Sequence, residues 1–294
     1  MHICFSSDSH YVQHLGVTLI SLLEHNRAAG KIHVYIIDGG ITPAQKAQLE
    51  DLVRPYDTEM TFLSIDSALF QGFMVDKHIT LASYYRIVLP DILPPQVEKI
   101  LYLDCDLLVL DSLRDLWHTD LGETYLAAVP ELDNFRHREM GSGNIPYFNA
   151  GVLLMNLAKW REASLTAKTL AFIRENPDQI AYHDQDALNK MVLEGWTKLD
   201  VKWNLIVPYI QERARFSIQQ HPSVVAAIMK PSIVHFNQSF KPWHYKLRHP
   251  YKYLYYQFLN KTPWKDYKQP DKNIENILRF HIGKTMKKVG LKKM

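Results

Sequence analysis

The stretch KILYLDCDLLVL, residues 99–110, is apolar on both sides of two aspartates, Asp104 and Asp106. Such an apolar run is typical of a buried strand, and the two carboxylates interrupt it. An unpaired buried charge costs on the order of several kcal/mol. In an extended chain, residues two apart point to the same side at about 6.5 Å. We therefore expect the two carboxylates to share a face and to hold a cation between them, and hard oxygen ligands favour Mn²⁺ or Mg²⁺.

Two other interpretations of this stretch remain open. The aspartates could cap a turn and pair with Lys or Arg. The stretch also resembles the nucleophile loop of haloacid-dehalogenase-type phosphatases, in which Asp104 would be the nucleophile and Asp106 the general acid. That loop normally has Thr or Gly-Thr after the second aspartate and lies near the start of the chain. Here Leu107 and Leu108 follow, and three strands come first.

Outward from this stretch, apolar runs alternate with helical patterns. The runs that we interpret as strands are residues 2–5, 31–37, 60–65, 99–103, 125–129 and 150–155. The predicted helices begin near Tyr11 and at Thr42-Pro43, and cover residues 81–89 (ending before Pro90), 165–175 and 185–194, while 134–146 is a predicted loop. This order predicts an α/β fold with a mostly parallel central sheet flanked by helices. Its ligand site should lie beyond the carboxyl ends of the strands, where Asp8 and Asp104 fall.

Composition excludes several classes of protein. The 294 residues are 47% hydrophobic and 22% charged, which excludes disorder and a coiled coil. The net charge of +3, from 34 basic and 31 acidic residues, is too even to indicate nucleic-acid binding. Cys4 and Cys105 lie in apolar runs, so we expect buried thiols in a reducing compartment. Without a run of roughly 18 apolar residues or a signal-peptide core, we expect a cytoplasmic protein.

Six short motifs follow one another along the chain. They are ICFSSD at 3–8, SYYR at 83–86, YLDCD at 102–106, YFNAGV at 147–152, HDQD at 183–186, and His235 followed by KPW at 241–243. In this order they resemble glycosyltransferase family 8, the retaining hexosyltransferases that include bacterial lipopolysaccharide glucosyl- and galactosyltransferases. The resemblance covers about residues 1–245. It implies a GT-A-type nucleotide-diphospho-sugar transferase fold over 1–245, with 246–294 as a helical C-terminal appendage.

The resemblance also implies an activity and a set of site residues. The donor would be UDP-glucose or UDP-galactose, and the acceptor an oligosaccharide or lipid-linked bacterial surface glycan. Asp104, Asp106 and His235 would bind Mn²⁺ or Mg²⁺. Gln185 would lie beside the anomeric carbon, and Asp184 would bind sugar hydroxyls. The implied donor-binding residues are Ser6, Asp8, Tyr11, Arg86, Cys105, Asn149, Ala150 and Lys241.

Several of these residues also fit a structural role. Asp8 could cap the helix that begins near Tyr11, and Tyr11 could stack on a base or pack in the core. Arg86 could form an ion pair on a short helix. The chain also departs from the family pattern: it has His10 where Asn or Asp is common, and no Gly between His235 and Lys241. We expect residues 131–144 to form part of the acceptor side.

The C-terminal residues 277–294 contain one Arg, five Lys and no acid, with apolar residues near helical spacing. A basic amphipathic end suits an anionic membrane surface, although a solvated tail has the same composition. We expect a peripheral protein at the inner face of the cell membrane, and no recognisable module indicates nucleic-acid binding. A non-catalytic nucleotide-sugar-binding module and a Mg²⁺ phosphohydrolase using Asp104 remain the alternative functions.

Overall fold

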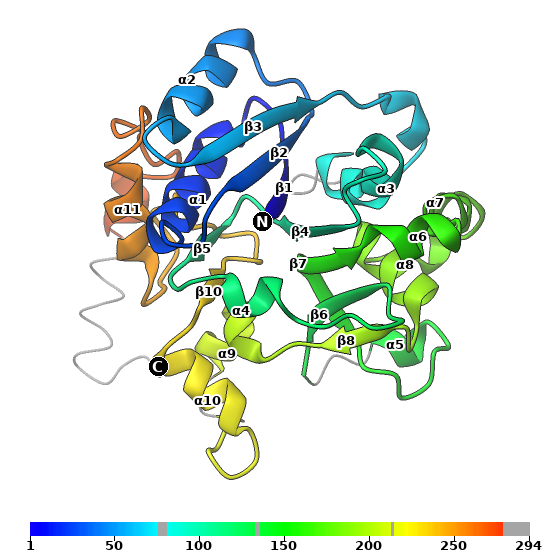
Figure 1. Ribbon diagram of the computed structural model, residues 1–294. Helices are drawn as coiled ribbons and strands as arrows, with labels where there is room; N and C mark the ends of the chain where they lie inside the picture. Colours follow the sequence, from blue (N-terminus) through cyan, green and yellow to red (C-terminus); the bar gives the residue numbers. More distant parts are fainter. Residues whose placement is uncertain (76–80, 133–135, 213–214, 279–294) are drawn as a thin grey trace.

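The computed structural model describes residues 1–75, 81–132, 136–212 and 215–278 (Figure 1). Its main sheet has the strand order β3-β2-β1-β4-β7-β6-β8. The strands are β1 (His2–Ser7), β2 (Ile32–Asp38), β3 (Thr58–Leu63), β4 (Lys99–Leu103), β6 (Leu126–Pro130), β7 (Phe148–Asn156) and β8 (Trp196–Lys198). β1 pairs in parallel with β2 and β4, whereas β7 is antiparallel to β4 and β6. The sheet is therefore mostly parallel, as predicted.

Alternate residues of each strand supply two hydrophobic cores, one on either face of the sheet. In β1, Ile3 and Phe5 belong to one core and Cys4 to the other, because successive side chains of a strand point to opposite faces. The first core contains side chains from α1 (Val12–His25), α2 (Pro43–Val53), α10 (Pro222–Met229) and α11 (Lys252–Leu259). The second core contains side chains from η2 (Leu81–Val88), α3 (Leu89–Ile92), α6 (Leu157–Glu162), α7 (Leu165–Glu175) and α8 (His183–Val192).

A smaller sheet, of order β5-β10-β9, packs into the first core. It contains β5 (Leu107–Val109), β9 (Leu205–Ile206) and β10 (Ile233–His235). Asp104 and Asp106 lie in the turn between β4 and β5, where the chain passes from one sheet to the other. The expectation that they lie in a continuous extended strand was therefore wrong. The turn places their carboxylates at the carboxyl end of β4.

The remaining elements are short. They are η1 (Ser67–Phe70), α4 (Arg114–Trp117), α5 (Arg136–Glu139), η3 (Pro177–Gln179), η4 (Val201–Trp203) and α9 (Val207–Gln211). α5 lies inside the segment 134–146, which we expected to be a loop. The helix predicted to end before Pro90 instead continues into α3, because a proline in the first turn of a helix needs no backbone N–H.

The C-terminal helix α11 packs against α1 (Figure 1). Its Tyr255, Phe258 and Leu259 are buried in the same core as the helices near the N-terminus. Residues 274–278 are helical, and the rest of the basic tail lies outside the described residues. Among the helices of the described ranges, none has the length and apolarity to cross a membrane.

Candidate active site

A cleft of about 480 Å³ lies beyond the carboxyl ends of β1 and β4. These neighbouring strands are followed by Asp8 and Asp104, as the sequence predicts. All of the predicted site residues line this cleft: Ser6, Asp8, Tyr11, Arg86, Asp104, Cys105, Asp106, Asn149, Ala150, Asp184, Gln185, His235 and Lys241. The fold thus brings together residues that are up to 235 positions apart in the chain, from Ser6 to Lys241.

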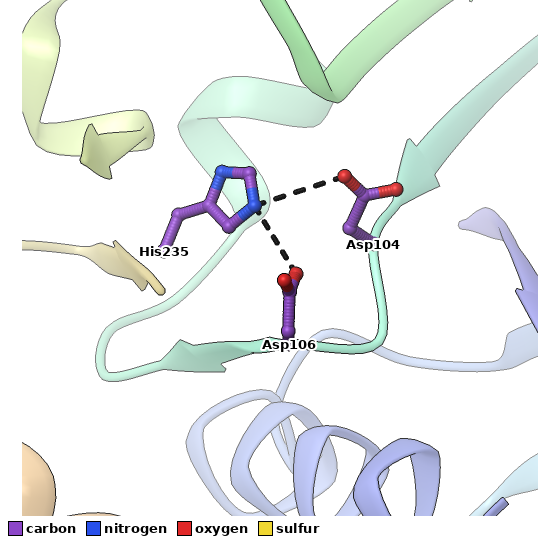
Figure 2. A group of neighbouring side chains, drawn as sticks. All are labelled: Asp104, Asp106 and His235. Carbon is purple, nitrogen blue, oxygen red and sulfur yellow. Dashed lines mark ion pairs between the residues drawn. The ribbon is translucent and has the colours of Figure 1, made fainter. Parts of the chain in front are cut away.

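Three of these side chains converge on one point (Figure 2). Nε2 of His235, at the end of β10, lies 3.1 Å from Oδ1 of Asp106 and 3.7 Å from Oδ2 of Asp104. One ligand atom from each residue lies within 4.8 Å of the others. Gly151 allows this approach, because a Cβ there would lie only 2.2 Å from Cε1 of His235. Two carboxylates and an imidazole at this spacing could hold a divalent cation.

The hydrogen bonds of His235 fit a metal ligand. Its Nδ1 lies 2.9 Å from Oδ1 of Asn204, an amide oxygen that can only accept, so Nδ1 carries the proton. The lone pair of Nε2 is then directed toward the carboxylates. Oδ1 of Asp106 is buried and accepts no hydrogen bond from the described residues. A cation would satisfy both atoms, so the residues fit a bound metal ion.

Lys241 is the nearest cationic side chain to Asp106. Its Nζ donates to Oδ2 of Asp106 at 2.5 Å and to the carbonyl of Phe236 at 2.8 Å. Burial raises the pKa of Asp106, but the Lys241 ammonium more than offsets this effect, so the net pKa lies well below its usual range. Asp106 therefore stays ionised, and an ammonium group lies beside it where phosphates could bind.

Arg86 bridges two acids on different elements. Its guanidinium lies 3.0 Å from Oδ1 of Asp104 and 3.0 Å from Oδ2 of Asp184, and only 5% of its side chain is exposed. Burial is the main reason that the pKa of Asp184 rises to about 6, and Asp104 adds to the rise while Arg86 opposes it. The Arg86 ion pair, one of the structural alternatives, is thus present, and it lies inside the cleft.

A chain of amides connects Gln185 to His235. Oε1 of Gln185 accepts from Nδ2 of Asn149 at 3.1 Å and from the backbone N–H of Ala150 at 3.0 Å. Oδ1 of Asn149 in turn accepts from Asn204 at 2.9 Å, and Asn204 accepts from His235. Nδ2 of Asn149 also donates to Glu131 at 2.8 Å. The orientation of Gln185 is therefore tied to that of His235.

Asn204 and Glu131 were not among the predicted site residues. Asn204 is fully buried beside the apolar run Leu205–Ile206, and a polar residue at such a position was the available signal. Glu131 lines the cleft. The sequence predicted only that residues 131–144, which begin with Glu131, form part of the acceptor side.

Asp8 and Tyr11 also line the cleft, and their other contacts bear on the structural roles left open. Oδ1 of Asp8 accepts from the backbone N–H groups of His10 and Tyr11, at 2.8 and 3.0 Å, in the turn before α1. The N-cap of α1 is Tyr11 and no side chain caps it, so the capping role expected for Asp8 was wrong. Tyr11 packs edge-on against Trp243 while it lines the cleft. Cys105 is buried, and its thiol donates to the carbonyl of Ser6 at 3.0 Å.

Comparisons with known proteins agree with this geometry. The model of glycosyl transferase family 8 matches residues 2–247. General stress protein A of Bacillus subtilis is 33% identical over 273 residues, which cover 90% of this chain and 94% of that protein. The lipopolysaccharide 1,2-glucosyltransferase of Escherichia coli is 24% identical over 286 residues, covering 95% of this chain and 83% of that protein.

Solved structures are similar over the same region. The galactosyltransferase LgtC in complex with donor and acceptor sugar analogues has a TM-score of 0.81 and 28% identity, and the match covers 90% of this chain and 96% of that one. An active-site mutant of LgtC, in which glutamate replaces a glutamine, has the same TM-score. These matches confirm the predicted GT-A fold, and the chain belongs to glycosyl transferase family 8.

Proposed function

We propose that this glycosyltransferase is a retaining hexosyltransferase that moves glucose or galactose from a UDP-sugar to a sugar hydroxyl of a bacterial surface glycan. The similarity to a lipopolysaccharide glucosyltransferase and to a galactosyltransferase supports this donor and acceptor class. The convergence of Asp104, Asp106 and His235 at the strand ends is the observation that carries the proposal. A divalent cation held there would offset the negative charge that develops on the departing diphosphate.

Lys241, Arg86 and Asp184 would bind the donor around this point. The Lys241 ammonium already lies 2.5 Å from Asp106, so the phosphates of a nucleotide at the Asp-Asp-His cluster would lie within its reach. Oδ2 of Asp184 is buried at the cleft and makes no hydrogen bond to the described residues, because the Nε–H of Arg86 is directed to the carbonyl of Ser83. This oxygen can accept from a sugar hydroxyl.

Gln185 would lie beside the anomeric carbon. A glutamine amide oxygen is a poor nucleophile, so we favour attack of the acceptor on the face that the diphosphate leaves. The new bond joins the acceptor oxygen to the anomeric carbon, the old bond breaks toward the diphosphate, and a β-phosphate oxygen takes the acceptor proton. The active-site glutamine of LgtC supports this position for Gln185.

Family membership favours glycosyl transfer over a phosphohydrolase that uses Asp104 as nucleophile. The contacts of Asp104 agree, because its Oδ1 accepts from the Tyr102 hydroxyl at 3.2 Å and pairs with Arg86 at 3.0 Å. These two partners stabilise the anionic carboxylate, and they lower its nucleophilicity.

Asp106→Ala and His235→Ala test the proposal directly. We expect each variant to lose Mn²⁺-dependent release of UDP from UDP-glucose and UDP-galactose by at least a hundredfold, while urea unfolding stays cooperative. Asp111→Ala and His118→Ala are matched controls, because both residues are exposed and lie outside the cleft. NMR of a transferred sugar should show an α-linkage, the configuration of the donor.

Three outcomes would contradict the proposal. Full activity of both variants in excess EDTA removes the metal-binding role of the cluster. A β-linked product removes retention. Binding of UDP-sugar with no UDP release under any acceptor favours the non-catalytic binding module.

We also propose that the basic tail attaches the enzyme to the inner face of the cell membrane, next to a lipid-linked acceptor. The composition of residues 277–294 supports this, and 279–294 lie outside the described residues. Deletion of 277–294 should release the protein from anionic vesicles without changing activity on a free oligosaccharide. Unchanged vesicle binding would refute the attachment.

A further inference from the structure

The segment that carries Lys241 is held from outside the cleft by α11. The hydroxyl of Tyr256 donates to the carbonyl of Pro242 at 3.1 Å. Nζ of Lys252, in the first turn of α11, donates to the carbonyls of His244, Tyr245 and Leu247 at 2.6, 3.2 and 3.2 Å. α11 lies beyond the predicted catalytic domain, yet it fixes the backbone next to Lys241.

His14, on α1, contacts the same segment through Trp243. The imidazole stacks on the Trp243 ring with the centroids 3.4 Å apart and an interplanar angle of 8°. Trp243 lies two residues after Lys241 and packs edge-on against Tyr11, which lines the cleft. A stacked pair of this kind adds attraction beyond the effect of the area that it buries. The position of the segment that carries Lys241 and Trp243 therefore depends on the His14 ring.

The polar atoms of His14 connect it to α11. Nε2 lies 3.3 Å from the amide nitrogen of Gln13, which can only donate, so Nε2 accepts and Nδ1 carries the proton. Nδ1 then donates to the hydroxyl of Tyr255 at 2.7 Å. The ring is 3% exposed, so this bond is protected from water. His14 thus joins α1, α11 and the Lys241 segment.

Gly16 supplies a second, independent link between α1 and the C-terminal region. A Cβ at this position would lie 2.4 Å from Cζ3 of Trp264, so α1 and Trp264 can approach only because residue 16 is glycine. Glycine inside a helix is less favourable than alanine. The contact with Trp264 offsets this cost, which indicates that docking of residues 252–267 on α1 is a specific feature of the fold.

We propose that His14 is a positioning residue of the donor site: by stacking on Trp243 and bonding to Tyr255, it fixes Lys241 for a nucleoside diphosphate. This inference rests on the proposed function, since it assumes that the cleft binds UDP. It extends the donor site to residues that touch no substrate. The stack, more than the hydrogen bond, sets the position of the segment, because the ring face contacts Trp243 directly.

The test compares UDP with UMP, which lacks the β-phosphate, in direct binding measurements with Mn²⁺ present. In His14→Ala we expect the Kd of UDP to rise about tenfold and that of UMP to change less than twofold. His14→Phe keeps a ring against Trp243 and should recover most of the UDP affinity, whereas His14→Asn keeps only a hydrogen-bonding group and should not. Tyr253→Phe is the control, because Tyr253 is an exposed tyrosine of α11.

Each result decides between the alternatives. Equal losses for UDP and UMP, or a Phe variant as weak as the Ala variant, would assign His14 a merely structural role and overturn the proposal, as would unchanged UDP binding. If His14→Ala does not fold, His14→Leu decides, because leucine is apolar but has no ring to stack on Trp243: a selective loss of UDP affinity of at least threefold supports the proposal, and wild-type selectivity overturns it. If the wild-type protein itself does not prefer UDP over UMP, the proposed donor is wrong.

Discussion

Asn204 accepts a hydrogen bond of 2.9 Å from Nδ1 of His235, and both side chains are almost fully buried. This contact sets the tautomer and the ring orientation of His235, so that Nε2 is directed at Asp104 and Asp106. Asn204 thus prepares the imidazole for a cation without touching the cation itself. The same side chain donates to Asn149, so it lies between the Asp-Asp-His cluster and Gln185.

Asn204→Ala should therefore weaken Mn²⁺ binding by about 10- to 100-fold, the usual cost of losing a group that orients a metal-ligating histidine. Titration of the variant with Mn²⁺, followed by calorimetry, measures this change. Asn204→Asp keeps an acceptor for Nδ1–H and should bind Mn²⁺ more tightly than the alanine variant. Equal Mn²⁺ affinity of Asn204→Ala and wild type would show that Asn204 does not orient His235.

Gly151→Ala should disrupt the same cluster by a steric route. A Cβ at residue 151 would lie 2.2 Å from Cε1 of His235 and 2.8 Å from Oδ2 of Asp104, so the imidazole must move. We expect loss of Mn²⁺ binding at concentrations that saturate the wild type, and destabilisation of about 1–3 kcal/mol from overpacking. Calorimetric titration and urea unfolding measure the two effects separately. Normal Mn²⁺ binding by the variant would mean that the cluster adapts to the extra methyl group.

The sequence predicted the alternation of strands and helices because each strand of the central sheet is a short apolar run between helical patterns. β4 begins and ends as predicted, at Lys99 and Leu103, and α7 covers the predicted residues 165–175. Extended geometry at Asp104 and Asp106 was wrong, because local hydrophobicity does not reveal that the chain leaves one sheet for another at that point. The two carboxylates still lie close together, as predicted, because a turn can also direct two side chains toward the same point.

The network behind the site could not be predicted in the same way. The partner of His235 is 31 residues away, and the link between His14 and Tyr255 spans 241 residues. Such contacts depend on tertiary packing, which the periodicity of a single segment does not encode. The motifs identified residues that face the cleft, whereas Asn204 and His14 lie behind it.

Arg86→Gln should destabilise the fold by about 3–5 kcal/mol, because it leaves the buried carboxylate of Asp184 and the partly exposed carboxylate of Asp104 without their shared cation. Urea unfolding without added metal measures the loss. The double variant with Asp184→Asn should recover part of it, since one of the two charges is then absent. Arg54→Gln is the control, as Arg54 forms an exposed pair with Asp51. A loss no greater than that of the control would mean that the guanidinium is not needed to offset these acids.

His14 should make the fold sensitive to mild acid. Its pKa is lowered to about 3, chiefly by burial; His244 and Lys241 add to the lowering, and Asp106 opposes it. The unfolded chain has a pKa of about 6.5 at this residue. Between these values the unfolded state binds more protons, so stability is fully present above pH 6.5 and falls as the pH falls.

Protonation of His14 in the unfolded chain should lower the free energy of unfolding by about 2 kcal/mol between pH 8 and pH 5. His14→Phe cannot bind a proton, so the variant should lose about 2 kcal/mol less than wild type between the two pH values. His249, whose pKa burial lowers to about 4, and Asp184 titrate in both proteins, and their effects cancel in the difference. Urea unfolding at pH 8 and pH 5 gives the four free energies needed. If wild type and His14→Phe lose the same stability, His14 is protonated in the folded protein at pH 5, and the buried, neutral imidazole that bonds Tyr255 does not persist in acid.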